Sequence, residues 1–241
     1  MLDTIKIDSK GVKMVAHRGV SGVEKENTCP AFVLGGNKSY YGIETDVHVT
    51  ADGKYIICHD DNIERVTGVS GVVIEESNFD DIVAVPILDT DGITKRTDLK
   101  FPTLADYISI CKKYGKVAVL ELKNRIEKEH IKGIIEQIRA IGWLDNTTFI
   151  SFNRENMVDL RALEPIVSAQ FLSCELNEEI IDFAVKTNVD LDIGFWNLTA
   201  EMVALAHEKG KIVNCWTVDK PEDAEKVIAL GVDMITSNIL E

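Results

Sequence analysis

The chain has 241 residues, a length that accommodates one α/β barrel with a large buried core. Its 26 Lys and Arg residues against 40 Asp and Glu residues give a formal net charge of -14. This charge repels nucleic-acid backbones and anionic membranes at long range, so we predict no nucleic-acid partner. A phosphate-bearing small molecule would need a local positive site within that overall field.

The cysteines and the amino-terminal residues bear on the compartment. The 5 cysteines are odd in number, widely spaced and without a CxxC pair, so they predict neither a disulfide framework nor a zinc site. The first residues, MLDTIKIDSKG, lack a basic start and an apolar stretch, and no run reaches the roughly 18 apolar residues that span a bilayer. We therefore predict a cytoplasmic protein with no stable membrane insertion.

Short β-branched runs alternate along the chain with stretches of helical periodicity. The predicted strands are residues 13–16, 43–49, 117–122, 147–151, 167–171, 189–193, 212–217 and 233–236. The predicted helices are residues 29–39, 103–114, 128–141, 154–163, 177–187, 199–209 and 221–230. So many βα alternations within about 250 residues favour a TIM (β/α)8 barrel over an open doubly wound sheet.

One irregular stretch interrupts this alternation after the second strand. Its Gly, Asp and Ser content with scattered valines predicts an inserted loop or small subdomain at approximately residues 60–100. We expect residues 1–241 to form a single barrel domain that includes this insertion. An insertion at this point could cover a site at the barrel mouth.

A hairpin is predicted after the second strand, because Asp52-Gly53 is a strong short-turn signal. A hairpin centred there pairs positions whose numbers sum to about 105, which places Asp46 opposite His59. Since strand side chains alternate, Glu44 shares the face of Asp46, and we expect His59 to join it. Two carboxylates and an imidazole in an apolar setting are costly unless they bind something, and a divalent metal beside an acid/base histidine suits them.

Other polar residues occupy the ends of predicted strands, which converge on one mouth in a barrel. The first strand ends in His17 and Arg18. The third ends in Glu121 and Lys123, which are two residues apart and therefore point the same way. Glu121 is a further candidate metal ligand, and Lys123 supplies a cation for phosphate oxygens. Trp216, near the end of the seventh strand, offers a flat surface for an organic group, although it could equally belong to the core.

The residue types suggest the chemistry. The oxygen ligands Glu44, Asp46 and Glu121 suit one Mg²⁺ or Ca²⁺ ion better than zinc. His17 and His59 then remain free to act as general acid and general base, which fits the cleavage of a phosphodiester. Taken singly, each residue is as consistent with a structural histidine or a surface ion pair, but their coincidence on three strands favours a site.

Several short strings also carry a family resemblance. They are HRG at 17–19, ENT at 26–28, IETDV at 43–47, TADG at 50–53, HD at 59–60, FPTL at 101–104, ELK at 121–123, SF at 151–152 and WTVD at 216–219. Together they resemble the glycerophosphodiester phosphodiesterase family, in order and over nearly the whole chain. The resemblance implies a TIM-barrel hydrolase that splits small glycerophosphodiesters into glycerol 3-phosphate and an alcohol.

The resemblance also implies roles for particular residues. It implies one divalent cation at Glu44, Asp46 and Glu121, acid/base work by His17 and His59, and phosphate contacts by Arg18 and Lys123. The family also has an insertion after the second strand, and the predicted insertion at approximately residues 60–100 matches it.

Two segments depart from the family pattern. The family often has Arg-Thr-Thr where this chain has Arg65-Val66-Thr67, and Ile-Thr-Asp-x-Pro where it has Ile235-Thr236-Ser237-Asn238. These departures leave the alcohol group open. Two alternatives therefore stand: a related phosphodiesterase acting on lysophospholipids or another organophosphate diester, and a catalytically silent barrel that binds a phosphate ester.

Overall fold

The computed structural model describes residues 3–241. Eight parallel strands form a closed ring in the order β1-β9-β8-β7-β6-β5-β4-β2, and pairing of β1 with β2 closes it. A further strand, β3, pairs antiparallel with β2 outside the ring. The strands are β1 Lys13–Ala16, β2 Gly42–Val49, β3 Tyr55–Ile57, β4 Val117–Leu122, β5 Thr147–Ser151, β6 Ser168–Ser173, β7 Asp190–Gly194, β8 Val213–Trp216 and β9 Met234–Ser237. The predicted TIM barrel is confirmed.

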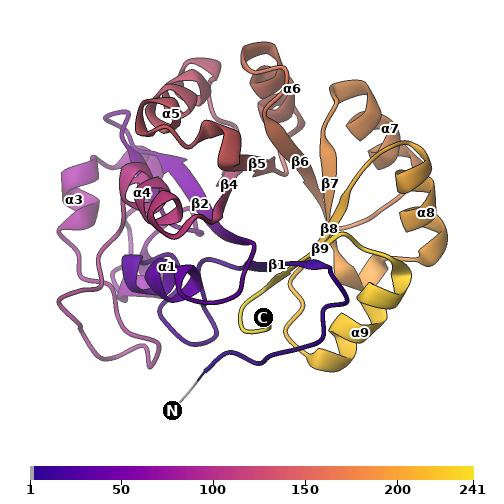
Figure 1. Ribbon diagram of the computed structural model, residues 1–241. Helices are drawn as coiled ribbons and strands as arrows, with labels where there is room; N and C mark the ends of the chain where they lie inside the picture. The colour runs from indigo at the N-terminus through magenta and orange to yellow at the C-terminus, as the bar shows by residue number, and fades with distance from the viewer. Residues whose placement is uncertain (1–2) are drawn as a thin grey trace.

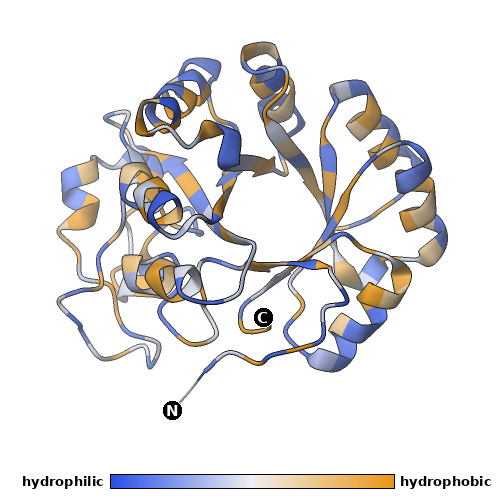
Figure 2. Cartoon of the chain, viewed as in Figure 1, coloured by the Kyte–Doolittle hydropathy of each residue, from blue (hydrophilic) through white to orange (hydrophobic). Residues whose placement is uncertain are grey.

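Helices surround the strands in an outer ring (Figure 1). The α-helices are α1 Cys29–Gly36, α2 Glu64–Thr67, α3 Phe79–Val83, α4 Leu104–Tyr114, α5 Lys128–Ile141, α6 Arg154–Leu163, α7 Glu178–Thr187, α8 Ala200–Glu208 and α9 Pro221–Leu230. The 3-10 helices are η1 Ile74–Glu76, η2 Leu144–Asn146 and η3 Phe195–Asn197. The outer helices carry both hydrophobic and hydrophilic residues along their length (Figure 2), as expected of helices that cover a sheet on one side only.

Helix α5 shows how the sequence produces this arrangement. Ile131, Ile134, Ile135 and Ile138 are buried, and their spacing places them along one face of a helix. Helix α5 ends at Ile141 and is capped by Gly142, whose φ of 75° is a left-handed conformation that glycine adopts at little cost. These features fix where the chain turns back to the next barrel strand.

Alternation along the strands separates the inside of the barrel from the layer beneath the helices. On β2, Ile43 and Val47 join the main apolar core between strands and helices. Glu44 and Asp46 therefore point into the barrel, as alternate residues on a strand must. A smaller inward-facing apolar cluster fills part of the interior; its buried members are Val15, Val119, Ile150, Leu172 and Met234.

The chain between β3 and α4 builds its own small core. Short elements α2, η1 and α3 lie in this stretch, which sits beside β2 in Figure 1. The buried residues of this core are Ile56, Cys58, Ile63, Val66, Ile74, Ile82, Ile87, Leu99 and Phe101. Because Ile56 belongs to β3, the insertion is packed onto the hairpin. That residues 1–241 form one domain stays a prediction, and residues 1 and 2 lie outside the described range.

The hairpin register differs from the predicted one by one residue. The amide of Gly53 donates to the carbonyl of Thr50 at 2.8 Å, and Gly53 has a φ of 73°. The loop thus holds three residues, with glycine in the left-handed position, rather than two. As a result the amide of Cys58 donates to the carbonyl of Asp46 at 3.1 Å. The prediction that His59 lies opposite Asp46 was wrong, because β3 ends at Ile57 and His59 lies beyond its end.

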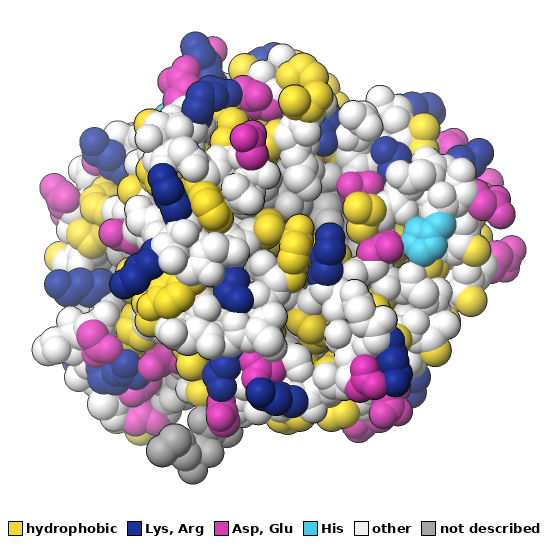
Figure 3. Space-filling model, viewed as in Figure 1, with side chains coloured by type: hydrophobic (Ala, Val, Ile, Leu, Met, Phe, Trp, Pro, Cys, Tyr) yellow, Lys and Arg dark blue, Asp and Glu magenta, His cyan; other side chains and the backbone are white. Residues whose placement is uncertain are grey.

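The surface shows both signs of charge. On the face drawn in Figure 3, Lys and Arg side chains are interspersed with Asp and Glu side chains. The acidic excess is therefore not gathered into one field on that face. Among residues 3–241, every helix falls short of the length and apolarity that a bilayer crossing requires.

Candidate active site

A cavity of about 100 Å³ collects most of the predicted site residues. It lies where residues from the carboxyl-terminal parts of several barrel strands meet. Its lining residues are His17, Arg18, Glu44, His59, Glu121, Ile150, Phe152, Leu172, Asp192, Trp216, Thr217 and Thr236. Of the other predicted residues, Asp46 is buried between Glu44 and Glu121, and Lys123 lines an adjoining hollow that also contains Glu121.

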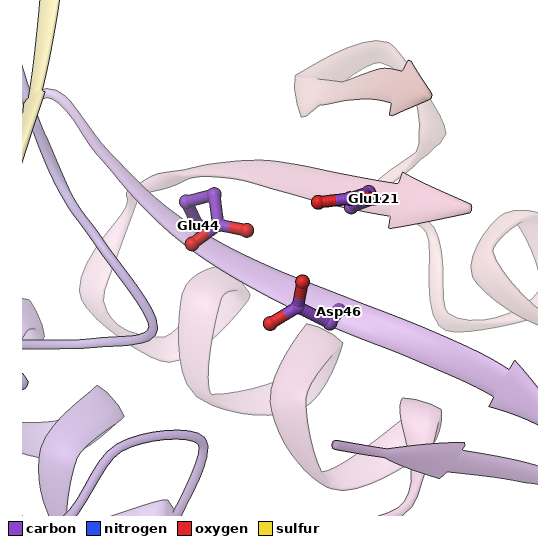
Figure 4. A group of neighbouring side chains, drawn as sticks. All are labelled: Glu44, Asp46 and Glu121. Carbon is purple, nitrogen blue, oxygen red and sulfur yellow. The ribbon is translucent and has the colours of Figure 1, made fainter. Parts of the chain in front are cut away.

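Three carboxylates form the polar wall of the site. Glu44 and Asp46 come from β2, and Glu121 stands next to Asp46 on the neighbouring strand β4. Each offers an oxygen within 4.8 Å of the others, and Figure 4 shows these side chains pointing toward one another. Their residues are only 3%, 1% and 8% exposed, respectively. Like charges this close and this buried need a cation.

Burial and neighbouring charges shift the pKa values of the three carboxylates in different directions. Burial, and then the neighbouring Asp46, raise the pKa of Glu44 well above its usual range and that of Glu121 to about 8. Burial acts in the same direction on Asp46, but Lys123 and Arg18 outweigh it and hold its pKa at about 2. Asp46 is therefore the carboxylate that keeps its charge most firmly.

These residues suit a hard divalent cation. All donor atoms are carboxylate oxygens, which Mg²⁺ and Ca²⁺ prefer. Within residues 3–241, Asp46 Oδ1 is buried and receives no hydrogen bond, and the Lys123 Nζ atom lies 3.6 Å from it. An acceptor oxygen left without a donor in a cluster of acids is the arrangement that a metal ion completes.

Two cations flank the acids. The Arg18 guanidinium donates from Nη1 to Glu26 Oε1 at 2.9 Å, and its Nε lies 3.7 Å from Asp46 Oδ2. That Nε is buried and has no hydrogen-bond partner among the described residues. Lys123 Nζ lies 3.0 Å from Glu121 Oε1. Both groups could turn part of their hydrogen-bonding capacity to an anionic ligand.

The HRG string forms a tight turn that sets Arg18 in place. Arg18 has a φ of 52° and Gly19 a φ of 77°, so two successive residues are left-handed. The amide of Arg18 donates to Glu44 Oε2 at 2.8 Å. A Cβ on Gly19 would lie 2.7 Å from the backbone of Ala31, so only glycine fits.

His17 is oriented by a neutral amide. Its Nδ1 lies 2.7 Å from Asn238 Oδ1, and the Asn238 amide nitrogen donates to Asp219 Oδ2 at 2.6 Å. An amide oxygen accepts hydrogen bonds, so Nδ1 carries the hydrogen and Nε2, 3.9 Å from Glu44 Oε2, is free to accept a proton. Burial, and then Arg18, lower the pKa of His17 to about 4, so the ring is neutral at neutral pH.

His59 is oriented by a carboxylate. Its Nδ1 lies 2.8 Å from Asp60 Oδ1. Arg65 donates from Nε to Asp60 Oδ2 at 2.6 Å and from Nη1 to Glu26 Oε2 at 2.7 Å, which ties the segment after β3 to the loop before α1. Burial lowers the pKa of His59, and the Asp46 and Asp60 carboxylates oppose that effect.

The two residues that orient His17, Asn238 and behind it Asp219, were not predicted from the sequence. Asn238 belongs to a segment that departs from the family pattern, and Asp219 closes the WTVD string. The chain places them side by side although they come from different strand ends. The departure itself was the available signal, because a changed residue beside a site points to a changed contact.

The opposite wall of the cavity is aromatic and aliphatic. Trp216 donates from its indole nitrogen to the carbonyl of Asp192 at 3.2 Å, which fixes the ring. The ring meets Phe152 and Trp196 edge to face, with centroids 5.6 and 5.3 Å apart. Phe152 and Trp196 are 46% and 54% exposed, so the aromatic surface continues outward from the cavity.

Comparison with known proteins agrees with this architecture. A family model described as the glycerophosphoryl diester phosphodiesterase family matches residues 17–241. The glycerophosphodiester phosphodiesterase of Caldanaerobacter subterraneus subsp. tengcongensis is 28% identical over 233 residues, which cover 93% of each chain. That of Bacillus altitudinis is 27% identical over 237 residues, covering 92% of this chain and 93% of the relative.

A solved structure shows the same fold. The phosphodiesterase of Oleispira antarctica, determined in complex with its product sn-glycerol-3-phosphate, superposes with a TM-score of 0.87. The superposition covers 98% of this chain and 96% of the other, at 24% identity. The barrel and the arrangement of its strands are therefore common to both proteins.

Proposed function

The chain belongs to the glycerophosphoryl diester phosphodiesterase family, and from this premise we propose that it hydrolyses glycerophosphodiesters to glycerol 3-phosphate and an alcohol with the aid of one divalent cation. Family membership makes it a phosphodiester hydrolase. The observation that carries the proposal is one cavity lined by two histidines and by two members, Glu44 and Glu121, of a buried cluster of three carboxylates. A small diester is the partner that such a cavity suits, and no nucleic acid is expected.

Glu44, Asp46 and Glu121 would hold the cation, either Mg²⁺ or Ca²⁺. When bound, the ion supplies positive charge that polarises the phosphate oxygens. Arg18 and Lys123 border the same acids and would contact the remaining phosphate oxygens. The cation, Arg18 and Lys123 would thus make the site locally positive despite the negative net charge of the chain, as binding of a phosphate ester requires.

The two histidines would divide the proton transfers. His17 accepts a proton at Nε2 from the attacking hydroxyl, because its other nitrogen is committed to Asn238. His59 donates a proton to the departing alcohol oxygen, since the carboxylate of Asp60 stabilises its protonated form. Trp216 would pack against the organic part of the substrate.

The test is release of glycerol 3-phosphate from a panel of glycerophosphodiesters by the purified protein, with Mg²⁺, Ca²⁺ or EDTA. We expect turnover that EDTA abolishes and that Asp46→Asn reduces by on the order of 10³-fold, since a metal contributes several kcal/mol to transition-state stabilisation. Turnover that survives EDTA and this substitution contradicts the metal site. Binding of glycerol 3-phosphate without turnover of any diester favours a silent barrel.

One observation keeps a second substrate class in view. The exposed Phe152 and Trp196 extend the apolar wall outward, which suits a diester that carries a hydrocarbon chain. The same panel therefore includes a lysophospholipid. Faster turnover of the lipid-tailed diester than of every soluble one would replace the first proposal with this one.

A further inference from the structure

A fourth buried acid lies in the cavity and has no part in the chemistry described above. Asp192, on β7, is 1% exposed and lines the same cavity as the carboxylates of the metal cluster. It is not part of that cluster, which comprises Glu44, Asp46 and Glu121. Its Oδ1 atom is buried and has no hydrogen-bond partner among residues 3–241. A buried acceptor that lines a cavity and has no donor is suited to a hydrogen bond from a ligand.

Within residues 3–241 no side chain donates a hydrogen bond to Oδ1; burial, and then Glu121, raise the pKa of Asp192 well above its usual range, and the Asn214 amide opposes that shift. Asn214, beside it on β8, uses its amide nitrogen to donate to Gln170 Oε1 at 3.3 Å and to Thr236 Oγ1 at 3.2 Å. Ile150, Leu172 and Trp216 give the cavity an apolar and aromatic wall, and Thr217 and Thr236 also line it. Asp192 is therefore a neutral buried acid whose Oδ1 has no hydrogen-bond donor among the described residues.

The position of Asp192 in the ring shows what it would meet. Strand β7 is four strands from β2 in either direction around the closed sheet, so the strand that carries Asp192 lies across the barrel from the strand that carries Glu44 and Asp46. Figure 1 shows β7 and β2 on opposite sides of the ring. A substrate whose phosphate lies at the carboxylate wall must extend its organic part toward β7. The cavity of about 100 Å³ is of a size that suits a small group such as glycerol.

We propose that Asp192 accepts a hydrogen bond from the glycerol hydroxyl farthest from the phosphate, and that this contact selects glycerol esters over esters of less hydroxylated alcohols. The inference rests on the proposed function and names the part of the substrate that enters the cavity. The carbon chain of glycerol packs against the apolar wall, while its terminal hydroxyl reaches Asp192. A site that is built to bind a hydroxyl discriminates strongly against the analogue that lacks it.

The experiment compares two diesters with the same alcohol group. One contains glycerol, and the other contains 1,2-propanediol, which keeps the hydroxyl next to the phosphoester and lacks the terminal one. The wild type should prefer the glycerol diester by roughly 10- to 100-fold in kcat/KM, because the propanediol diester leaves a buried polar group without its hydrogen-bond partner. Asp192→Leu should reduce this preference to within roughly twofold, mainly through a loss on the glycerol diester. Asp192→Asn, which keeps an acceptor oxygen, should retain part of it.

Asp190→Asn is the matched control. Asp190 lies on the same strand, accepts a hydrogen bond from the amide of Ile212 at 3.0 Å and does not line the cavity, so its replacement should leave the preference unchanged. An Asp192→Leu variant that keeps the wild-type preference overturns the inference. A variant that is folded but loses the same factor on both diesters also overturns it, because the loss then has no connection with the terminal hydroxyl.

A binding measurement separates this inference from the proposed function. Calorimetric titration with glycerol 3-phosphate and with 1,2-propanediol 1-phosphate requires no turnover. The wild type and Asp190→Asn should favour glycerol 3-phosphate, whereas Asp192→Leu should bind the two compounds equally. Absence of turnover in the wild type would count against the proposed hydrolase, while the binding preference would still decide the role of Asp192.

Discussion

The two histidines of the site are held by different parts of the molecule. His17 follows β1, is hydrogen-bonded to the amide of Asn238, and has a side chain that is 16% exposed. His59 lies beyond the end of β3, is hydrogen-bonded to Asp60, and has a side chain that is 34% exposed. Strand pairing fixes the segment that carries His17, which we call the barrel side. Ion pairs fix the segment that carries His59, which we call the insertion side. The contrast shows how one residue type is prepared for opposite proton transfers by its partner.

Removing each imidazole in turn gives the largest expected effect. His17→Ala and His59→Ala should each lower kcat by about 10²- to 10⁴-fold, the usual contribution of a general acid or base. Added imidazole should restore more activity to His59→Ala than to His17→Ala, because the insertion side is more open to solvent. His207→Ala, which alters a histidine paired with Asp233 outside the cavity, is the control. Full activity of either site variant would remove that histidine from the mechanism.

The barrel side carries an electrostatic cost that the insertion side lacks. The pKa of Glu121 is about 8 in the folded protein, against about 4.5 unfolded, because of burial and Asp46. A carboxyl with a raised folded-state pKa destabilises the fold as pH rises from 4.5 to 8, and the full effect is on the order of a few kcal/mol. Glu121→Gln should therefore be more stable than the wild type at pH 8 without metal, and the difference should shrink below pH 4.5.

Chemical denaturation at several pH values, with and without Ca²⁺, measures this difference. Bound metal should raise the stability of the wild type more than that of Glu121→Gln, because the ion offsets the repulsion among the acids. Equal stabilities of the two proteins across the pH range would show that the cluster carries no such cost.

Substitution of Arg65 should weaken the ion pairs of the insertion side and leave the barrel side unchanged. Arg65→Ala releases Asp60 from Glu26, so His59 loses its fixed orientation, and kcat should fall roughly 10-fold. Arg96→Ala is matched, since Arg96 is also in the insertion and also pairs with several acids but does not contact Asp60. Steady-state kinetics distinguish the two. Equal kcat values would show that the ion pairs do not hold the site.

Exchanging the partners of His17 should give the smallest effect. The double substitution Asp219→Asn with Asn238→Asp keeps the hydrogen-bonded chain and moves the carboxylate next to His17. An adjacent carboxylate favours the protonated imidazole, so the pKa of His17 should rise from about 4 by about one unit. Because neutral His17 is the proton acceptor, the acid limb of the kcat/KM profile should move to higher pH. A profile that keeps its acid limb contradicts this role.

The sequence predicted the barrel and most of its strand limits, because β-branched runs and helical periodicity report local burial. It did not predict the hairpin register, since Asp52-Gly53 fits loops of two and of three residues equally well. It also did not predict α2, η1 and α3, which are short and are stabilised by packing against the hairpin. Elements of that kind depend on tertiary contacts that periodicity does not contain.

The predicted site residues lie together because strand ends of a barrel converge, whichever register the hairpin takes. Roles within the site depended on partners that come from distant parts of the chain. Asn238 and Asp192 are examples: the first lies in a segment that departs from the family pattern, and the second lies in the predicted strand at 189–193, where the sequence predicted no role for it. Only the folded geometry shows that one orients His17 and that the other faces the cavity.

The hydrogen bond between His17 and Asn238 joins residues that are 221 positions apart. Strand β9 also pairs with β1, so the ring closes only when both strands have been synthesised. A nascent chain on the ribosome has neither a closed barrel nor an oriented His17 until β9 and Asn238 have left the exit tunnel. Competence for hydrolysis would therefore arise in one late step and not gradually during synthesis.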